Sequence, residues 1–123
     1  MAIFWVGLGG FLGANARYLL ALFVGYRWPS AFPLGTFIIN ITGSFILGFF
    51  MAYASTRSWV HPNARLMFAV GFVGAYTTFS TFSYETIRLI QTHQPILATL
   101  NIVGSVLAGG LAVLAGLALG EYL

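Results

Sequence analysis

The sequence has no cysteine, lysine or aspartate, and the only charged residues among its 123 positions are five arginines and two glutamates. The absence of cysteine excludes disulfides, thiolate metal sites and thiol catalysis. The small positive charge without lysine argues against a polybasic surface, so nucleic acid is not expected as a partner. With 6% charged and 59% hydrophobic residues, the chain has too little polar surface for a soluble globule. Lipid must cover most of it.

The side-chain groupings that enzymes use for catalysis are also scarce. His61 and His93 lie in different loops, no two carboxylates lie close in sequence, and no glycine-rich phosphate loop follows a strand pattern. We therefore expect no enzyme activity.

What the sequence does have is four long apolar segments. Each crossing of a bilayer needs roughly 20 mostly apolar residues, so four crossings use about 80 and leave only short loops. The expected spans are residues 3–24, 34–53, 64–91 and 96–119. The sequence thus predicts an all-α membrane protein with one transmembrane domain over residues 1–123.

The third segment is too long for a simple span. As one straight helix, residues 64–91 would extend about 42 Å. Gly71 and Gly74 interrupt the segment, and a polar run over residues 77–83 follows them. We therefore predict a broken helix, with the break around residues 74–77.

Small residues recur every fourth position in the last segment, at Gly104, Ala108, Ala112, Gly116 and Gly120. Lipid gives helices no hydrophobic reason to pair, so a stripe of small side chains predicts close contact with another helix. The partner helix belongs either to the same protomer or to a second copy.

Four of the five arginines fall near the ends of the predicted bundle, and they are shared equally between the two ends. Arg57 and Arg65 fall on the side of the termini, whereas Arg27 and Arg88 fall on the opposite side. Because orientation normally follows the side with more Arg and Lys, an equal division gives little bias. The sequence predicts insertion in both orientations and an antiparallel homodimer; a single orientation fixed by weaker cues is the alternative.

Polar side chains form a stripe on the second span. Thr36, Asn40 and Ser44 are four residues apart and share one helix face. Polar groups at membrane depth tend to face the protein interior or a water-filled path. The Asn40 amide can either bond a neighbouring helix or donate to an anion in transit.

The polar run of the third span combines aromatic rings and hydroxyls. Phe79 and Phe82 are three residues apart, and Ser80 and Ser83 repeat that spacing, so a helix would place them on two adjacent faces. Ring edges carry partial positive charge and can contact an anion, to which hydroxyls can also donate. Alternatively, the rings face lipid and the hydroxyls bond the backbone of their own helix.

Four further polar residues have predicted roles near the helix ends. Arg17 either anchors its helix by extending toward the interface or raises the anion concentration at a vestibule. Glu85 and Arg88 are expected to form an ion pair on the helix surface, because they are three residues apart. Asn63 is well placed to cap the third helix.

Three segments carry a family resemblance: residues 13–18 (GANARY), 35–45 (GTFIINITGSF) and 74–85 (GAYTTFSTFSYE). In this order they resemble the small fluoride channels of bacteria and archaea, over nearly the whole chain. The TTFSTFS run followed by glutamate is the most specific part.

The resemblance implies passive fluoride export through a multi-pass protein of the prokaryotic cell membrane, built as an antiparallel homodimer with two pores. It also implies one central structural sodium ion, held by backbone carbonyls that match Gly74 and Thr77. The matching anion-pathway residues are Arg17, Thr36, Asn40, Phe79, Ser80, Thr81, Phe82, Ser83 and Ser105.

The fourth span departs from the family pattern, and two rival functions remain. Asn101 stands where an aromatic is expected, and Gly109 where some members have serine, so the contribution of this helix is open. One rival is a small dual-topology multidrug or cation exporter, but such an exporter needs a membrane carboxylate, which the first span lacks. The other rival is a non-transporting membrane subunit.

Overall fold

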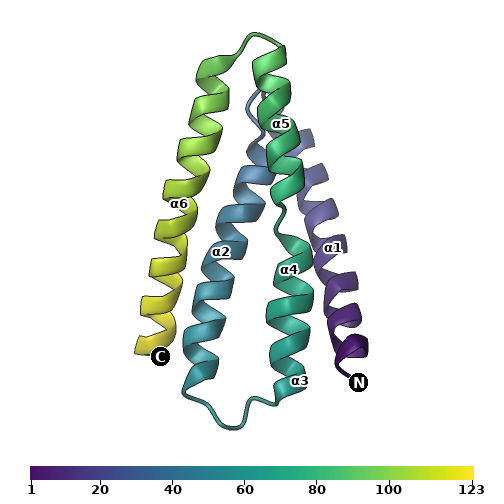
Figure 1. The fold of residues 1–123 in the computed structure, drawn as a ribbon, viewed down its shortest axis with the longest axis vertical. Helices are drawn as coiled ribbons and strands as arrows, with labels where there is room; N and C mark the ends of the chain where they lie inside the picture. The colour runs from purple at the N-terminus through teal and green to yellow at the C-terminus, as the bar shows by residue number, and fades with distance from the viewer.

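The computed structural model describes residues 1–123 and is entirely helical (Figure 1). The first, second and fourth crossings are unbroken helices, whereas the third crossing is made of four consecutive pieces. The elements are α1 (Ala2–Arg27), α2 (Leu34–Ser55), α3 (Pro62–Arg65), η1 (Leu66–Val73, a π-helix), α4 (Gly74–Tyr76), α5 (Phe79–Gln91) and α6 (Pro95–Tyr122). All four crossings are long and apolar enough to span a membrane, so the predicted fold class is confirmed.

The helices extend slightly beyond the predicted spans, and the third crossing starts at Pro62. Its cap is His61, whose Nδ1 accepts the backbone N–H of Asn63 at 3.1 Å. Proline suits the first helical position because its missing N–H would have no partner there. The prediction that Asn63 caps this helix is therefore wrong.

The small-residue stripe of α6 packs against α2 of the same chain. An added Cβ at Gly120 would lie 2.5 Å from the Phe49 carbonyl oxygen, and one at Gly116 would overlap the backbone of Phe45. From the other side, a Cβ at Gly48 would lie 2.5 Å from the Val113 carbonyl oxygen. Of the two alternatives for the stripe, the structure supports close packing within one protomer.

Helix α1 meets the third crossing in a similar way. A Cβ at Gly9 or Gly13 would overlap the backbone of η1, and one at Gly71 would lie 2.6 Å from the Val6 carbonyl oxygen. The glycine-rich first span therefore packs closely against η1, in the first half of the third crossing.

The four arginines of the loops and helix ends are divided as predicted. Both chain termini and the α2–α3 loop, with Arg57 and Arg65, lie at one end of the bundle (Figure 1). The α1–α2 and α5–α6 connections, near Arg27 and Arg88, lie at the other end.

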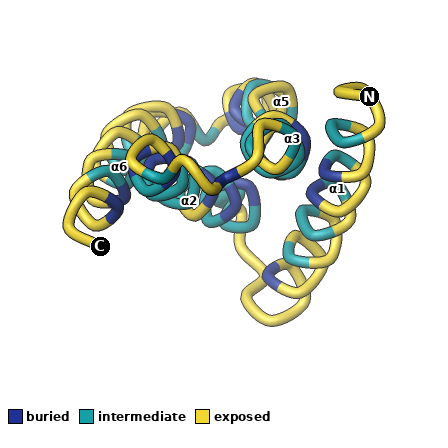
Figure 2. Tube along the Cα trace, turned by 90° about the horizontal axis from the view of Figure 1, so that it is seen from below, coloured by how far each residue is buried: buried dark blue, intermediate teal, exposed yellow.

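Few side chains of this chain are buried. Only 19 of 123 residues are buried, and they lie along the faces where helices meet (Figure 2). Large apolar side chains on α1 and α6 are exposed over most of their length. Lipid or another protein must cover these surfaces.

Candidate functional site

The centre of the site is the break in the third crossing, where Thr77 and Thr78 are extended. Their backbone angles are φ −79°, ψ 156° and φ −147°, ψ 122°. At the carboxyl end of α4, the Thr77 N–H still donates to the Val73 carbonyl at 3.0 Å. Helix α5 begins with a side-chain cap, because the Thr78 hydroxyl accepts the Thr81 N–H at 3.3 Å. The predicted break is confirmed, and it lies at residues 77–78.

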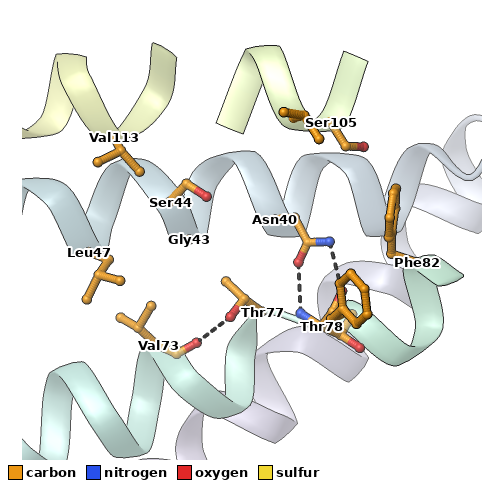
Figure 3. A pocket seen from close by; sticks show the side chains of 12 residues that line it. Asn40, Gly43, Ser44, Leu47, Val73, Thr77, Thr78, Phe82, Ser105 and Val113 are labelled. Carbon is orange, nitrogen blue, oxygen red and sulfur yellow. Dashed lines mark hydrogen bonds between the residues drawn. The ribbon is translucent and has the colours of Figure 1, made fainter. Parts of the chain in front are cut away.

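Asn40 on α2 pairs with both backbone groups of Thr78. Its Nδ2 donates to the Thr78 carbonyl at 2.9 Å, and its Oδ1 accepts the Thr78 N–H at 2.8 Å (Figure 3). The amide therefore replaces the hydrogen bonds that the broken helix cannot supply. Because one Nδ2 hydrogen satisfies this pairing, the second one remains for another acceptor.

Arg17 on α1 contacts the same break from the other side. Its Nε donates to the Ala75 carbonyl at 3.1 Å, at the carboxyl end of α4. A positive charge is favourable there, because the last carbonyls of a helix have partial negative charge. The structure places Arg17 beside the break and outside the main cavity.

A cavity of about 350 Å³ lies next to the break, between α2, the third crossing and α6 (Figure 3). Its lining is neutral: one amide, four hydroxyls, two phenyl rings, one glycine and four aliphatic side chains. These residues are Asn40, Gly43, Ser44, Leu47, Val73, Thr77, Thr78, Phe79, Phe82, Ser105, Val106 and Val113. The cavity exceeds the volume of one water molecule, about 30 Å³, so an ion with some of its hydration water fits.

The chain matches a known protein family over most of its length. Residues 4–117 match the family described as CrcB-like protein, Camphor Resistance (CrcB). The chain belongs to the CrcB-like family.

Three relatives illustrate the similarity, and each is named a fluoride-specific ion channel FluC. The protein of Acidobacterium capsulatum is 44% identical over 98% of this chain and 97% of its own length. That of Moorella thermoacetica (FluC 1) is 46% identical over 90% and 79%, and that of Koribacter versatilis 52% identical over 71% and 69%. The family match and the four membrane-spanning helices together show that the chain is a multi-pass protein of the cell membrane.

Four of the predicted pathway residues of this CrcB-like protein meet at the cavity: Asn40, Phe79, Phe82 and Ser105. The rings of Phe79 and Phe82 lie side by side, with centroids 6.0 Å apart and planes inclined by 41°. Phe79 is 80% exposed, so the cavity is open on that side of the protomer. Despite its departures from the family pattern, α6 contributes to the lining.

Thr36 lies away from this cavity, beside Glu85. The Thr36 hydroxyl donates to a Glu85 carboxylate oxygen at 2.5 Å, and both residues line a second hollow near the α1–α2 loop. Arg88 donates instead to the Gln91 side chain at 3.2 Å. The predicted Glu85–Arg88 ion pair is therefore wrong, because Glu85 points across to α2.

The remaining predicted residues lie on the third crossing outside the cavity lining. Ser80 is exposed, and Thr81 and Ser83 are half-buried. None of their hydroxyls forms a hydrogen bond within the chain, whereas the alternative of local backbone bonding applies to Thr77 and Thr86. Gly74 is an exposed residue just before the break.

Sequence reasoning gave no pathway role to Ser44, Thr78 or Gly43. Ser44 belongs to the predicted polar stripe on α2, and Thr78 belongs to the polar run of the third span. Both patterns could therefore have indicated these two residues as part of the cavity lining. Gly43 had none: its role depends on the side chains of Tyr76 and Thr77, which pack directly over it.

Proposed function

We propose that this chain is a fluoride channel through which fluoride crosses the membrane passively. The observation that carries the proposal is the neutral, donor-lined cavity at the helix break, with the Asn40 amide, hydroxyls and two phenyl rings and no ionisable side chain. The name that its relatives carry, fluoride-specific ion channel, supports the same ion. Passive flow follows the gradient, so export lowers cytoplasmic fluoride whenever its concentration is higher inside.

The chemistry of the cavity suits a small anion. Fluoride is strongly hydrated, so a narrow path must replace its water with several donors that are individually weak. A full counter-charge would hold the ion instead of releasing it. Amide N–H groups, hydroxyls and the positive edges of phenyl rings meet this requirement. A cation exporter is not favoured, because no carboxylate lines the cavity or lies on α1.

Two phenylalanines test the anion path. We expect Phe79→Ile and Phe82→Ile each to reduce fluoride efflux from liposomes by at least about tenfold, the loss of about 1.4 kcal/mol of stabilisation along the path. Phe11→Ile is the control, because Phe11 is an exposed ring on α1 outside the cavity, and this variant should keep the efflux of the unmodified chain. Efflux unchanged in both Phe variants would rule out a role for the ring edges.

The functional unit of the proposal is an antiparallel homodimer. The cavity is open beside Phe79, which is 80% exposed, and the arginines of the loops and helix ends are divided two and two between the ends of the bundle. A second copy in the opposite orientation would close the open side of the cavity beside Phe79. The two-fold symmetry of such a pair gives two pores.

Reporter fusions test the orientation. Because two arginines lie at each end, we expect a reporter at the carboxyl terminus to be active on both sides of the membrane. Two added lysines in the α2–α3 loop should bias the protein toward one orientation. A signal from a single side in the unmodified chain would contradict dual topology.

A structural sodium ion is the last part of the proposal, with the Gly74 and Thr77 carbonyl oxygens as its ligands. Sodium prefers oxygen ligands, and the break leaves these two carbonyls without a donor in the chain: the Thr78 N–H bonds Asn40, and the Thr81 N–H bonds the Thr78 hydroxyl. Thr77 lies at the break and Gly74 one turn before it, close to the two backbone carbonyls that Arg17 and Asn40 bond, those of Ala75 and Thr78.

Removal of sodium tests this site. If the ion holds two protomers together, exchange of sodium for N-methylglucamine should lower the unfolding temperature of the purified protein and the fraction of dimer. Fluoride efflux should fall in parallel. A dimer fraction, unfolding temperature and efflux that do not respond to sodium would count against the site.

A further inference from the structure

We infer that Asn101 is a positioning residue that accepts the hydroxyl hydrogen of Ser105 when no anion is present and competes with the passing anion for it. The inference rests on the proposed function. It concerns one of the two positions on α6 where the chain departs from the family pattern.

Asn101 is the most deeply buried polar residue of the chain, with 1% of its surface exposed. Its Nδ2 donates to the Thr86 hydroxyl oxygen on α5 at 2.9 Å. Thr86 in turn donates its hydroxyl hydrogen to the Phe82 carbonyl at 2.8 Å. A buried side chain with these partners joins α6 to the segment of α5 that carries a cavity ring.

This chain of hydrogen bonds has a fixed direction. Because Thr86 gives its only hydroxyl hydrogen to the Phe82 carbonyl, its oxygen toward Asn101 must accept. Asn101 must therefore turn its NH₂ toward Thr86 and its carbonyl oxygen toward Ser105, one turn further along α6. The Ser105 hydroxyl donates to that oxygen at 3.4 Å.

The bond to Ser105 is the weak link of the chain. At 3.4 Å it is longer than the 2.9 Å and 2.8 Å bonds beyond it, and hydrogen bonds weaken with distance. Ser105 is half-buried and lines the cavity beside Phe82. An anion is a stronger acceptor than an amide oxygen, so its arrival should turn the hydroxyl toward the cavity. When the anion leaves, Asn101 takes the hydrogen back.

The consequence for permeation is a lower affinity at this point of the path. When Ser105 donates to the anion, its hydrogen bond to Asn101 is lost. The net binding free energy that the anion gains at Ser105 is therefore smaller than it would gain from a hydroxyl with no other partner. A shallower binding site lets the ion leave faster, as conduction requires.

The test is the concentration dependence of fluoride efflux. In Asn101→Leu the acceptor of this weak bond is absent, so we expect the half-saturating fluoride concentration to fall about two- to threefold and the maximal flux to fall with it. Ser105→Ala removes the donor. In the Ser105→Ala background, Asn101→Leu should have no further effect on either quantity, because Asn101 acts through Ser105.

A purely structural clamp between α5 and α6 predicts a different pattern. Thr86→Val removes both the clamp and the group that sets the direction of the Asn101 amide, so we expect it to shift the half-saturating fluoride concentration as Asn101→Leu does. A clamp acts without Ser105, so an undiminished effect of Asn101→Leu in the Ser105→Ala background would overturn the inference. If Asn101→Leu does not fold, Asn101→Ala removes the same acceptor without adding bulk. The absence of efflux from the unmodified protein would defeat the proposed function itself, a result distinct from these.

Discussion

Asn40→Ala strongly reduces both fluoride efflux and thermal stability in our account. The substitution leaves the N–H and carbonyl of Thr78 without partners at a part-buried position. Each buried backbone group that loses its hydrogen bond costs about 1–3 kcal/mol, so we expect about 2–6 kcal/mol in total. The break at residues 77–78 loses its lateral support, and the donor that Asn40 offers to the cavity disappears.

The measurements are fluoride release from liposomes and the unfolding temperature in detergent. Asn15→Ala is the matched control, because Asn15 bonds only the Phe11 carbonyl one turn back on α1 and is exposed. We expect efflux to fall at least about tenfold in Asn40→Ala, which corresponds to about 1.4 kcal/mol along the path. Asn15→Ala should behave like the unmodified chain. Equal behaviour of the two variants would contradict the role of Asn40 at the break.

Gly43→Ala should be the second most damaging change. The added methyl group would overlap Cγ2 of Thr77 and lie 3.1 Å from the Tyr76 ring. Both neighbours are fixed: Thr77 donates its hydroxyl to the Val73 carbonyl at 3.0 Å, and Tyr76 is buried. Overpacking of this kind costs about 1–3 kcal/mol, and here it displaces the residue at the break.

Two further variants make the Gly43 prediction specific. Thr77→Ser removes Cγ2 and keeps the hydroxyl, so Gly43→Ala combined with Thr77→Ser should recover most of the unfolding temperature and flux. Gly110→Ala is the control on α6, because an added Cβ there meets nothing within 4 Å. A Gly43→Ala protein that is as stable and as active as Gly110→Ala would show that the packing over Gly43 is unimportant. Failure of the double variant to recover would place the damage elsewhere.

The crossings of this fold could be predicted because apolar length is a local property of sequence. Each predicted span agrees with one crossing to within a few residues at either end. The start of the third crossing was misplaced because histidine caps a helix less often than asparagine does, and the cap here is His61.

The helix break could be predicted only approximately. The glycines at 71 and 74 suggested it, yet Gly74 is helical and the extended residues are Thr77 and Thr78. What stabilises the break is the Asn40 amide, 38 residues earlier in the chain. No local pattern identifies such a partner. For the same reason the spacing rule for Glu85 and Arg88 failed, since it contains no information about Thr36 on α2.

The candidate site was partly visible in the sequence. The polar stripe of α2 and the Phe–Ser run of the third crossing both supply cavity residues, because polar groups at membrane depth need a polar destination. Of the two alternatives considered for Asn40, the structure shows the bond to a neighbouring segment, and because Asn40 also lines the cavity, donation to an anion stays a prediction. The link between Asn101 and Ser105 could not be seen, because it depends on the direction of the Thr86 hydroxyl.

The most direct test of the central claim is fluoride release from liposomes that contain the purified protein, recorded with a fluoride-selective electrode. Liposomes loaded with potassium fluoride and treated with valinomycin should release fluoride much faster than protein-free liposomes, and the same protein should release little chloride from liposomes loaded with chloride. Release at the protein-free rate, or equal release of both halides, would contradict the account.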